Sequence, residues 1–143
     1  MKWIPIDRHY IYLRDGGRCR YCGKALRYGS MSLDHYLPHS AGGPDAVYNL
    51  VCACKTCNRD KRAIIPEDWE ALWREAFSQA LADRKIALAP GLYYTALPDC
   101  SAGILAARLE GQIAIFDTKC KRFHVKQNEI VKLTDINIFT DEP

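Results

Sequence analysis

The sequence has no long hydrophobic run and no apolar leader. Its apolar stretches fall well short of the ~20 residues that a membrane-spanning helix requires, and charged residues interrupt the first segment, MKWIPIDRHYIYLRD. We therefore expect no membrane helix and no secretory signal, and we expect the protein in the cytoplasm. The 143 residues, 48% of them hydrophobic and 26% charged, are typical of one globular domain, with or without a small appendage.

The sequence also lacks an even number of cysteines, which a complete set of disulfide pairs would require. The seven cysteines are an odd number, and no export signal accompanies them. These features argue against a disulfide framework and favour a reducing compartment.

Four of the cysteines form two C-x-x-C units, Cys19 with Cys22 and Cys54 with Cys57. Each such turn directs two thiolates at one point, and Gly23 allows a tight turn after the first pair. Four sulfur ligands are the tetrahedral set that structural zinc prefers, so we predict a zinc site with four cysteine ligands. The alternatives are a redox C-x-x-C, whose usual thioredoxin-like surroundings are not evident, and unrelated buried thiols.

Three further cysteines lie outside these pairs: Cys52, Cys100 and Cys120. We expect them to be small apolar core residues. Cys52 is two positions before Cys54 and so remains an alternative zinc ligand.

Charge is unevenly distributed along the chain. Residues 1–65 carry eleven Lys and Arg against five Asp and Glu, whereas residues 66–143 carry nine against twelve. A basic first half is typical of proteins that bind a polyanion, with nucleic acid as the leading candidate. An ordinary solvated surface is the alternative.

The segment between the two cysteine pairs predicts two strands. SMSLDHYL is apolar enough for a short strand, which Pro38 and the sequence Gly42-Gly43-Pro44 then break. VYNLVCAC predicts a second strand, and KTCNRDKRA a short helix. We expect the strands to pair across the glycine loop and the zinc to join their ends to the helix.

This arrangement resembles the zinc-containing HNH endonucleases, whose core is the ββα-metal finger. The matching elements are C-x-x-C-G, D-H-x-x-P-x-S-x-G-G, N-L and C-x-x-C-N-x-x-K, in this order within residues 16–61. RHYIYLRDGG also resembles the short helix that precedes the first cysteine pair in such proteins. The resemblance implies an HNH nuclease finger over residues 1–65 and metal-dependent hydrolysis of DNA phosphodiester bonds.

The resemblance also implies a role for each motif residue. His35 corresponds to the general base and Asp34 to the acid before it, which is usually a metal ligand. Asn49 corresponds to the middle asparagine, and Asn58 stands at the third motif position. Asp34 and Asn58 would bind a catalytic divalent cation, Mg²⁺ or Mn²⁺. His39 departs from the pattern, because many members carry a basic residue such as arginine there.

These residue types suit the chemistry. Imidazole can accept the proton of the attacking water, and a hard cation prefers carboxylate and amide oxygens. We expect the Asn49 carbonyl to accept a hydrogen bond from one ring nitrogen of His35, leaving the other free as the base. Neighbouring residues on a regular strand face opposite sides, so Asp34 and His35 share a site only if the strand ends or twists there. The alternative is a polar turn pair, with the asparagines in turns or helix caps.

Basic side chains around the finger are expected to contact the DNA backbone. Such contacts give salt-sensitive and weakly sequence-specific binding, here to DNA that we expect to be double-stranded. The candidates are Arg18, Arg20, His39, Lys55, Arg59, Lys61 and Arg62.

The rest of the chain shows two different hydrophobic patterns, one helical and one typical of strands. Residues 66–86 show apolar positions at 3–4-residue spacing, acids near the start and bases near the end, which predicts an amphipathic connecting helix. Packing in the core is favoured over binding of a protein partner. Residues 87–143 predict a small antiparallel β-sheet or SH3-like module, which could dock DNA or protein or simply close the core. His124 lies in its strand pattern and is expected to be structural.

The sequence thus predicts an α+β protein in which a ββα-metal finger with a zinc site precedes a helix and a small sheet. The predicted function is that of a metal-dependent HNH endonuclease acting on DNA. Two alternatives remain. One is a non-catalytic zinc-finger module that binds nucleic acid, and the other is a regulatory or inhibitor protein that binds a protein partner through residues 66–139.

Overall fold

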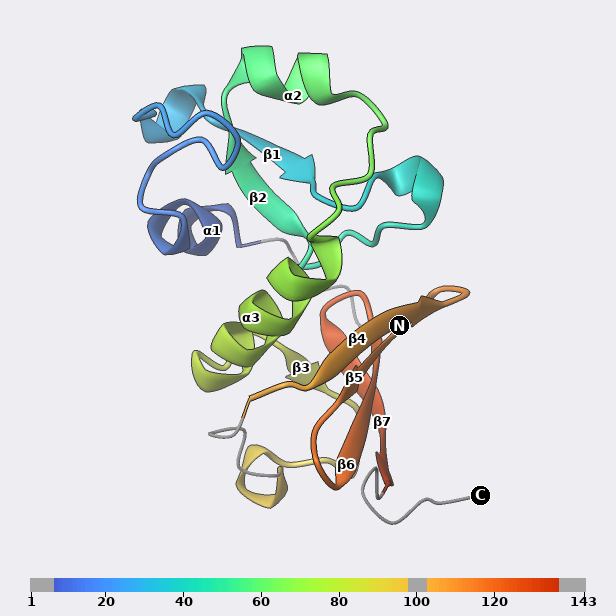
Figure 1. Cartoon of the computed structure of the whole chain (residues 1–143). Coiled ribbons are helices and arrows are strands. Elements are labelled where there is room, and N and C mark those ends of the chain that lie inside the picture. Colours follow the sequence, from blue (N-terminus) through green and yellow to red (C-terminus); the bar gives the residue numbers. More distant parts are fainter. Residues whose placement is uncertain (1–6, 98–102, 137–143) are drawn as a thin grey trace.

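The computed structural model describes residues 7–97 and 103–136, arranged as an α+β fold. A long helix, α3, lies between a two-stranded sheet built from the first part of the chain and a five-stranded sheet built from the last part (Figure 1). We call residues 7–65 the N-terminal unit and residues 87–136 the C-terminal sheet. Cys100, which we expected in the core, lies outside the described residues.

The N-terminal unit has the predicted order of strand, loop, strand and helix. β1 (Ser32–His35) pairs antiparallel with β2 (Leu50–Ala53), which places Asp34 opposite Val51. A loop with a short 3₁₀ turn at His39–Ala41 joins the strands, and α2 (Lys55–Lys61) follows β2 directly. Both strands are shorter than the apolar runs that predicted them.

Helix α1 (Arg8–Arg14) packs on β2, and a 3₁₀ turn follows at Tyr28–Ser30. The Arg14 guanidinium donates hydrogen bonds of 2.7 Å to the carbonyls of Val47 and Leu50. The Asp15 carboxylate accepts the backbone N–H of Cys52 at 2.8 Å. Arg14 and Asp15 also pair with each other at 3.0 Å, with side chains only 6% and 5% exposed. The backbone groups at the outer edge of β2 thus find their hydrogen-bond partners in a buried ion pair.

Helix α3 (Trp69–Ala82) supplies the centre of the hydrophobic core, as its apolar spacing predicted. On one side Trp73 meets Tyr48 of the N-terminal unit edge to face, at 5.1 Å between ring centroids. On the other side Phe77 stacks on Phe116 of the C-terminal sheet at 3.9 Å. One aromatic cluster therefore joins both sheets through α3. The apolar face of α3 is buried in this cluster and is not available to a protein partner.

The helix is shorter than the predicted range 66–86. It begins at Trp69 with Asp68 at the N-cap position, where the Asp68 carboxylate accepts the Tyr36 hydroxyl at 2.6 Å and makes no capping hydrogen bond. It ends at Ala82 with Asp83 as the C-cap, and Arg84 follows at a positive φ of 54°.

The C-terminal sheet has the order β3-β7-β6-β5-β4. Its strands are β3 (Ala87–Leu88), β4 (Ala106–Glu110), β5 (Ile113–Asp117), β6 (Lys121–Lys126) and β7 (Glu129–Asp135), with a 3₁₀ turn at Tyr94–Ala96 after β3. Strands β4 to β7 pair antiparallel as predicted. The short β3 adds a parallel partner to β7, which the sequence did not predict.

Three smaller predictions meet different outcomes. Cys52 is fully buried, as expected, but Cys120 is exposed in the turn before β6, so the prediction of a core position was wrong for it. His124 lies on β6, where its ring is within 3.1 Å of the Thr134 hydroxyl. Within the described ranges, we find no helix with the length and apolar character needed to cross a membrane.

Candidate active site and metal centre

The four cysteines of the two C-x-x-C units meet at one point. The Sγ atoms of Cys19, Cys22, Cys54 and Cys57 all lie within 4.8 Å of one another. Cys22 and Cys54 approach to 4.0 Å, and the Cys57 backbone N–H donates to the Cys54 sulfur at 3.3 Å. Tetrahedral coordination with zinc–sulfur bonds of ~2.3 Å needs sulfur separations slightly under 4 Å, so this set could hold a metal ion such as zinc.

Local structure forms this cluster from both ends of the hairpin. Gly23 adopts a positive φ of 76° after the first pair, as the C-x-x-C-G spacing predicted. Cys54 is the N-cap of α2, so the second pair spans the end of β2 and the first turn of the helix. Cys52 is fully buried and is not one of the four sulfurs that meet here, so it is not part of this ligand set.

The thiols do not share one protonation preference. Burial would raise the pKa of the Cys19 thiol, but hydrogen bonds from the backbone of Cys22, Cys54 and Tyr21 outweigh it and lower the pKa to about 6. The hydrogen bond with Cys54, aided by burial, raises the pKa of Cys57 to about 12. Four thiolates cannot coexist here without a cation, which is the donor chemistry of a metal site.

Asp34 lies near the end of β1 and is buried. Its Oδ2 atom accepts a hydrogen bond from the Tyr21 hydroxyl and lies 3.4 Å from the Lys61 ammonium. Burial, together with the Asp34 contact, raises the pKa of Tyr21, so the hydroxyl remains a donor. Both contacts involve Oδ2, which leaves Oδ1 as the oxygen for a further ligand.

His35 follows as the last residue of β1, and its ring faces the loop. Its Nε2 atom lies 2.5 Å from Oδ1 of Asp45, and the ring of His39 is 5.8 Å away in an edge-to-face arrangement. The His35 side chain is 31% exposed, so solvent and substrate can reach it. Asp45 was not predicted from the sequence, although it is the acid at the end of the glycine loop, which pairing of the two strands brings back to the end of β1.

Asn49 does not hold the His35 ring, contrary to our expectation. Its amide oxygen accepts the backbone N–H of Leu37 at 2.9 Å and the indole N–H of Trp73 at 2.8 Å. Its amide nitrogen donates to the carbonyls of Leu37 and Pro44, both at 3.1 Å. Fully buried and bonded four times, Asn49 fixes the loop that carries Asp45 rather than the histidine itself.

The two glycines of the loop are required by close packing. A Cβ atom on Gly43 would lie 1.7 Å from the Leu37 carbonyl oxygen and 2.9 Å from the Asn49 amide nitrogen. Gly42 has a φ of 91°, and a Cβ there would lie 2.9 Å from Leu109 of β4. The glycine pair thus lets the loop approach both β1 and the C-terminal sheet.

Asn58 lies on α2 above β1. Its amide nitrogen donates to the Ser32 hydroxyl at 3.1 Å, and Ser32 shares the face of β1 that carries Asp34. The amide oxygen of Asn58 is therefore directed away from Ser32. The described contacts bring Asn58 to the same strand as Asp34 without joining the two side chains.

The predicted DNA-contacting residues fall into two groups. Lys61 differs from the other candidates, because its side chain is only 8% exposed and donates to the His35 carbonyl at 3.1 Å besides pairing with Asp34. The remaining candidates lie at the surface, in the loops around the cysteine cluster, on α2 and beside His35: Arg18, Arg20, His39, Lys55, Arg59 and Arg62.

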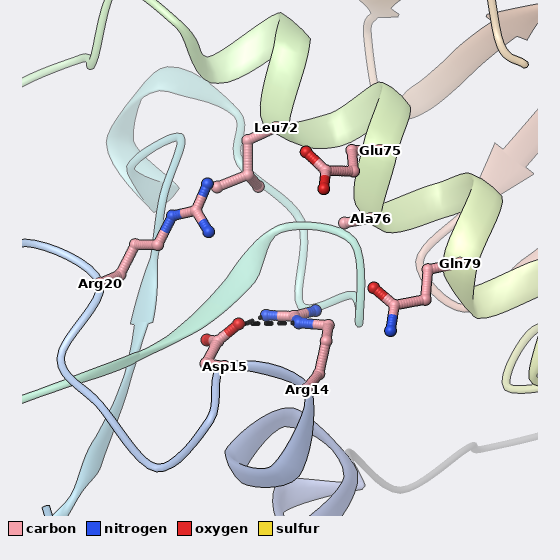
Figure 2. Close-up of a pocket in the computed structure, with 7 residues that line it drawn as sticks. All are labelled: Arg14, Asp15, Arg20, Leu72, Glu75, Ala76 and Gln79. Carbon is pink, nitrogen blue, oxygen red and sulfur yellow. Dashed lines mark hydrogen bonds and ion pairs between the residues drawn. The ribbon is translucent and has the colours of Figure 1, made fainter. Parts of the chain in front are cut away.

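A small cavity of about 80 Å³ lies away from these motif residues, between α1 and α3. Figure 2 shows the Arg14–Asp15 pair on one side of it and Glu75 and Gln79 of α3 on the other, with Arg20 at the margin. It is too small for a nucleotide and contains none of His35, Asp34 or the cysteines. We regard it as a packing gap around a buried ion pair.

Comparisons with known proteins agree with the motifs. Residues 19–71 match the family model described as HNH endonuclease. The chain is also 40% identical over 47 residues to the CRISPR-associated endonuclease Cas9 of Actinomyces naeslundii. That alignment covers 32% of this chain and 4% of the relative, so the chain spans a small fraction of the relative's length. The resemblance to HNH endonucleases is thereby confirmed for the segment that carries both cysteine pairs.

Proposed function

We propose that this protein is a metal-dependent endonuclease that hydrolyses DNA phosphodiester bonds, with His35 as the general base. The observation that supports it most is the His35 ring at the end of β1, whose side chain is 31% exposed and bonded to Asp45 through Nε2. A base must be reachable by substrate and held in one orientation, and this ring meets both conditions. The family match over residues 19–71 supports the same chemistry.

Asp45 takes the positioning role that we expected of Asn49. Its carboxylate would accept a hydrogen bond from Nε2–H, which keeps the proton on Nε2 and leaves Nδ1 unprotonated and able to take a proton from water. An adjacent carboxylate also stabilises the imidazolium that forms once the proton has moved. Asn49 would act indirectly, because its hydrogen bonds to the carbonyls of Leu37 and Pro44 fix the loop that carries Asp45.

Asp34 and Asn58 would hold the catalytic divalent cation. A carboxylate and an amide oxygen are hard donors that suit Mg²⁺ or Mn²⁺, and Oδ1 of Asp34 and the amide oxygen of Asn58 are the atoms that the described contacts leave for it. The bound ion would neutralise charge that develops on the phosphate and the leaving oxygen. Lys61 offsets the charge of the Asp34 carboxylate and fixes its second oxygen.

A structural zinc in the four-cysteine cluster completes the proposed fold, a ββα-metal finger. The ion would join the loop after α1, the end of β2 and the start of α2. It would therefore determine where α2 lies over β1, and with it the position of Asn58 and Lys61. Exposed basic residues such as Lys55, Arg59 and Arg62 would bind the phosphate backbone of double-stranded DNA.

One observation favours a second candidate, a zinc finger that binds nucleic acid without cutting it. The Asp34 carboxylate is already compensated by Lys61 and Tyr21 in a site with side chains about 10% exposed. A carboxylate so compensated binds a divalent cation less strongly than an unpaired one.

A plasmid-nicking assay separates the two candidates. Wild-type protein should nick supercoiled DNA with Mg²⁺ or Mn²⁺ and not with EDTA, and His35→Ala should lower the rate by roughly 10²-fold or more. His124→Ala, which removes a histidine from the C-terminal sheet, serves as the matched control and should retain activity. DNA binding without nicking by the wild type would select the non-catalytic module. Equal nicking by the wild type and His35→Ala would assign the cleavage to another site or a contaminant.

A further inference from the structure

The C-terminal sheet lines a cleft beside the proposed active site. The cleft has a volume of about 340 Å³ and opens between the loop of the N-terminal unit and two turns of the sheet. The loop contributes His39 and residues 42–45, and the turns contribute Gln112, Lys126 and Gln127. These last three side chains take no part in the site described above.

This cleft is built by direct contact between the two parts of the chain. The backbone N–H of Val47 donates a 2.6 Å hydrogen bond to the side-chain oxygen of Asn128, which is buried in the β6–β7 turn. The backbone carbonyl of Asn128 accepts from Ala87 at 2.7 Å, so the turn is held from both sides. The preceding residue, Gln127, adopts a positive φ of 53°. Lys126 and Gln127 are therefore carried by a turn with a fixed position relative to the loop.

The cleft is continuous with the proposed catalytic pair. Asp45 lines it and also bonds to His35, and His39 lines it at 5.8 Å from the His35 ring. Asp45 brings a carboxylate to the cleft, where it hydrogen-bonds to His35, and Lys126 brings a cation to the opposite wall. The two glutamine side chains add amide donors at neutral charge.

We propose that the β4–β5 and β6–β7 turns form the second wall of the DNA-binding cleft. Lys126 would contact a backbone phosphate next to the scissile bond, and the amides of Gln112 and Gln127 would donate to the same backbone. This inference rests on the proposed endonuclease function and gives the C-terminal sheet a role in it. A lysine with neighbouring amides is a common way to bind phosphate oxygens without reading base sequence.

Binding and cleavage of duplex DNA test the proposal. Lys126→Ala, Gln112→Ala and Gln127→Gly each remove one side chain, and glycine accommodates the positive φ at position 127. Lys119→Ala is the matched control, because Lys119 is an exposed lysine in the turn at the other end of β6. Dissociation constants of two duplexes of unrelated sequence are measured over a salt series in the His35→Ala background, and KM and kcat in the active background.

Lys126→Ala should raise the dissociation constant by roughly 3- to 10-fold for both duplexes and reduce the slope of log K against log salt by about 1. It should raise KM more than it lowers kcat, and Lys119→Ala should match the parent protein. Equal behaviour of the two lysine variants, or a loss confined to one duplex sequence, would overturn the proposal while leaving the nuclease assignment intact. Wild-type protein that neither binds nor nicks DNA would overturn both.

Discussion

The indole N–H of Trp73, at the first full turn of α3, donates a 2.8 Å hydrogen bond to the amide oxygen of Asn49. The same oxygen accepts the N–H of Leu37, and the amide nitrogen bonds two carbonyls of the loop. One buried side chain thus connects the helix, the end of β1 and the glycine loop. The proposed catalytic pair, His35 and Asp45, stands on the two chain segments that this connection holds.

Asn49→Ala should destabilise the protein by about 3–5 kcal/mol. It leaves two buried N–H groups and two carbonyls without their partner, and each such loss typically costs about 1–3 kcal/mol with incomplete additivity. Trp73→Phe removes one donor to the Asn49 oxygen together with part of a fully buried ring, and it should cost less than Asn49→Ala because the other three Asn49 bonds remain. Denaturant unfolding measures both, with Gln79→Ala on the exposed side of α3 as control. A change below ~1 kcal/mol for Asn49→Ala would contradict the connecting role.

Gly43→Ala should disrupt the loop. The new methyl group would lie 1.7 Å from the Leu37 carbonyl oxygen, so backbone must move, and the Asn49 bonds must lengthen with it. We expect a loss of at least ~2 kcal/mol of stability and lower nicking activity. Gly29→Ala is the control, because no atom lies within 4 Å of a Cβ there. Equal melting temperatures for the two variants would show that the loop tolerates the displacement.

Removal of zinc should unfold the N-terminal unit. Since the four thiols come from segments on either side of the hairpin, binding of the ion should contribute directly to folding free energy. A strong chelator should lower the melting temperature, and Cys19→Ser should abolish the zinc content found by elemental analysis. Cys120→Ser changes an exposed cysteine outside the cluster and should leave both unaltered. Well-folded protein without any bound metal would refute this prediction.

Asp45→Ala should lower kcat by about 10- to 100-fold with little change in KM. The histidine would remain but lose the partner that selects its orientation, and misplacement of a catalytic group by ~1 Å can cost about 10²-fold. Asp45→Asn should restore part of the rate, because an amide oxygen can still accept from Nε2. If the two residues act together, adding Asp45→Ala to His35→Ala should have almost no further effect. Asp60→Ala, an exposed acid on α2, is the control.

The N-terminal unit could be predicted from the sequence because its signals are local. Cysteine spacing, the Asp34-His35 pair and the glycine loop each act within a few residues, and together they predicted two strands paired across the loop. The partners of Asn49 could not be predicted, because Trp73 reaches it only through packing of the whole helix. The role of Asp45 could in principle have been predicted, because strand pairing brings the end of the loop back beside the end of β1.

The C-terminal sheet shows a similar division. Alternating apolar residues and turn signals predicted β4 to β7, but β3 has only two residues and no periodicity to detect. Its parallel pairing follows from the direction in which α3 delivers the chain. The contact between Asn128 and Val47 joins positions 81 residues apart, so the cleft could not have been inferred from any sequence motif.

Lys61 provides the last test, because its role differs between the sequence-based prediction and the structure. As a DNA-contacting residue it would affect binding alone, whereas its pairing with Asp34 predicts an effect on stability and metal affinity. Lys61→Met should cost ~3 kcal/mol in EDTA, since a buried carboxylate loses its counter-charge. Mg²⁺ or Mn²⁺ should stabilise this variant more than it stabilises the wild type. The bound ion replaces the lost Lys61 ammonium beside Asp34, and that ammonium no longer repels it. Thermal unfolding over a metal titration measures both effects.

The control is Arg59→Ala, because the Arg59 side chain is 75% exposed. This variant should weaken DNA binding without altering the metal titration. A Lys61→Met variant that weakens DNA binding but melts like the wild type, with and without metal, would restore the DNA-contacting role and remove Lys61 from the Asp34 site.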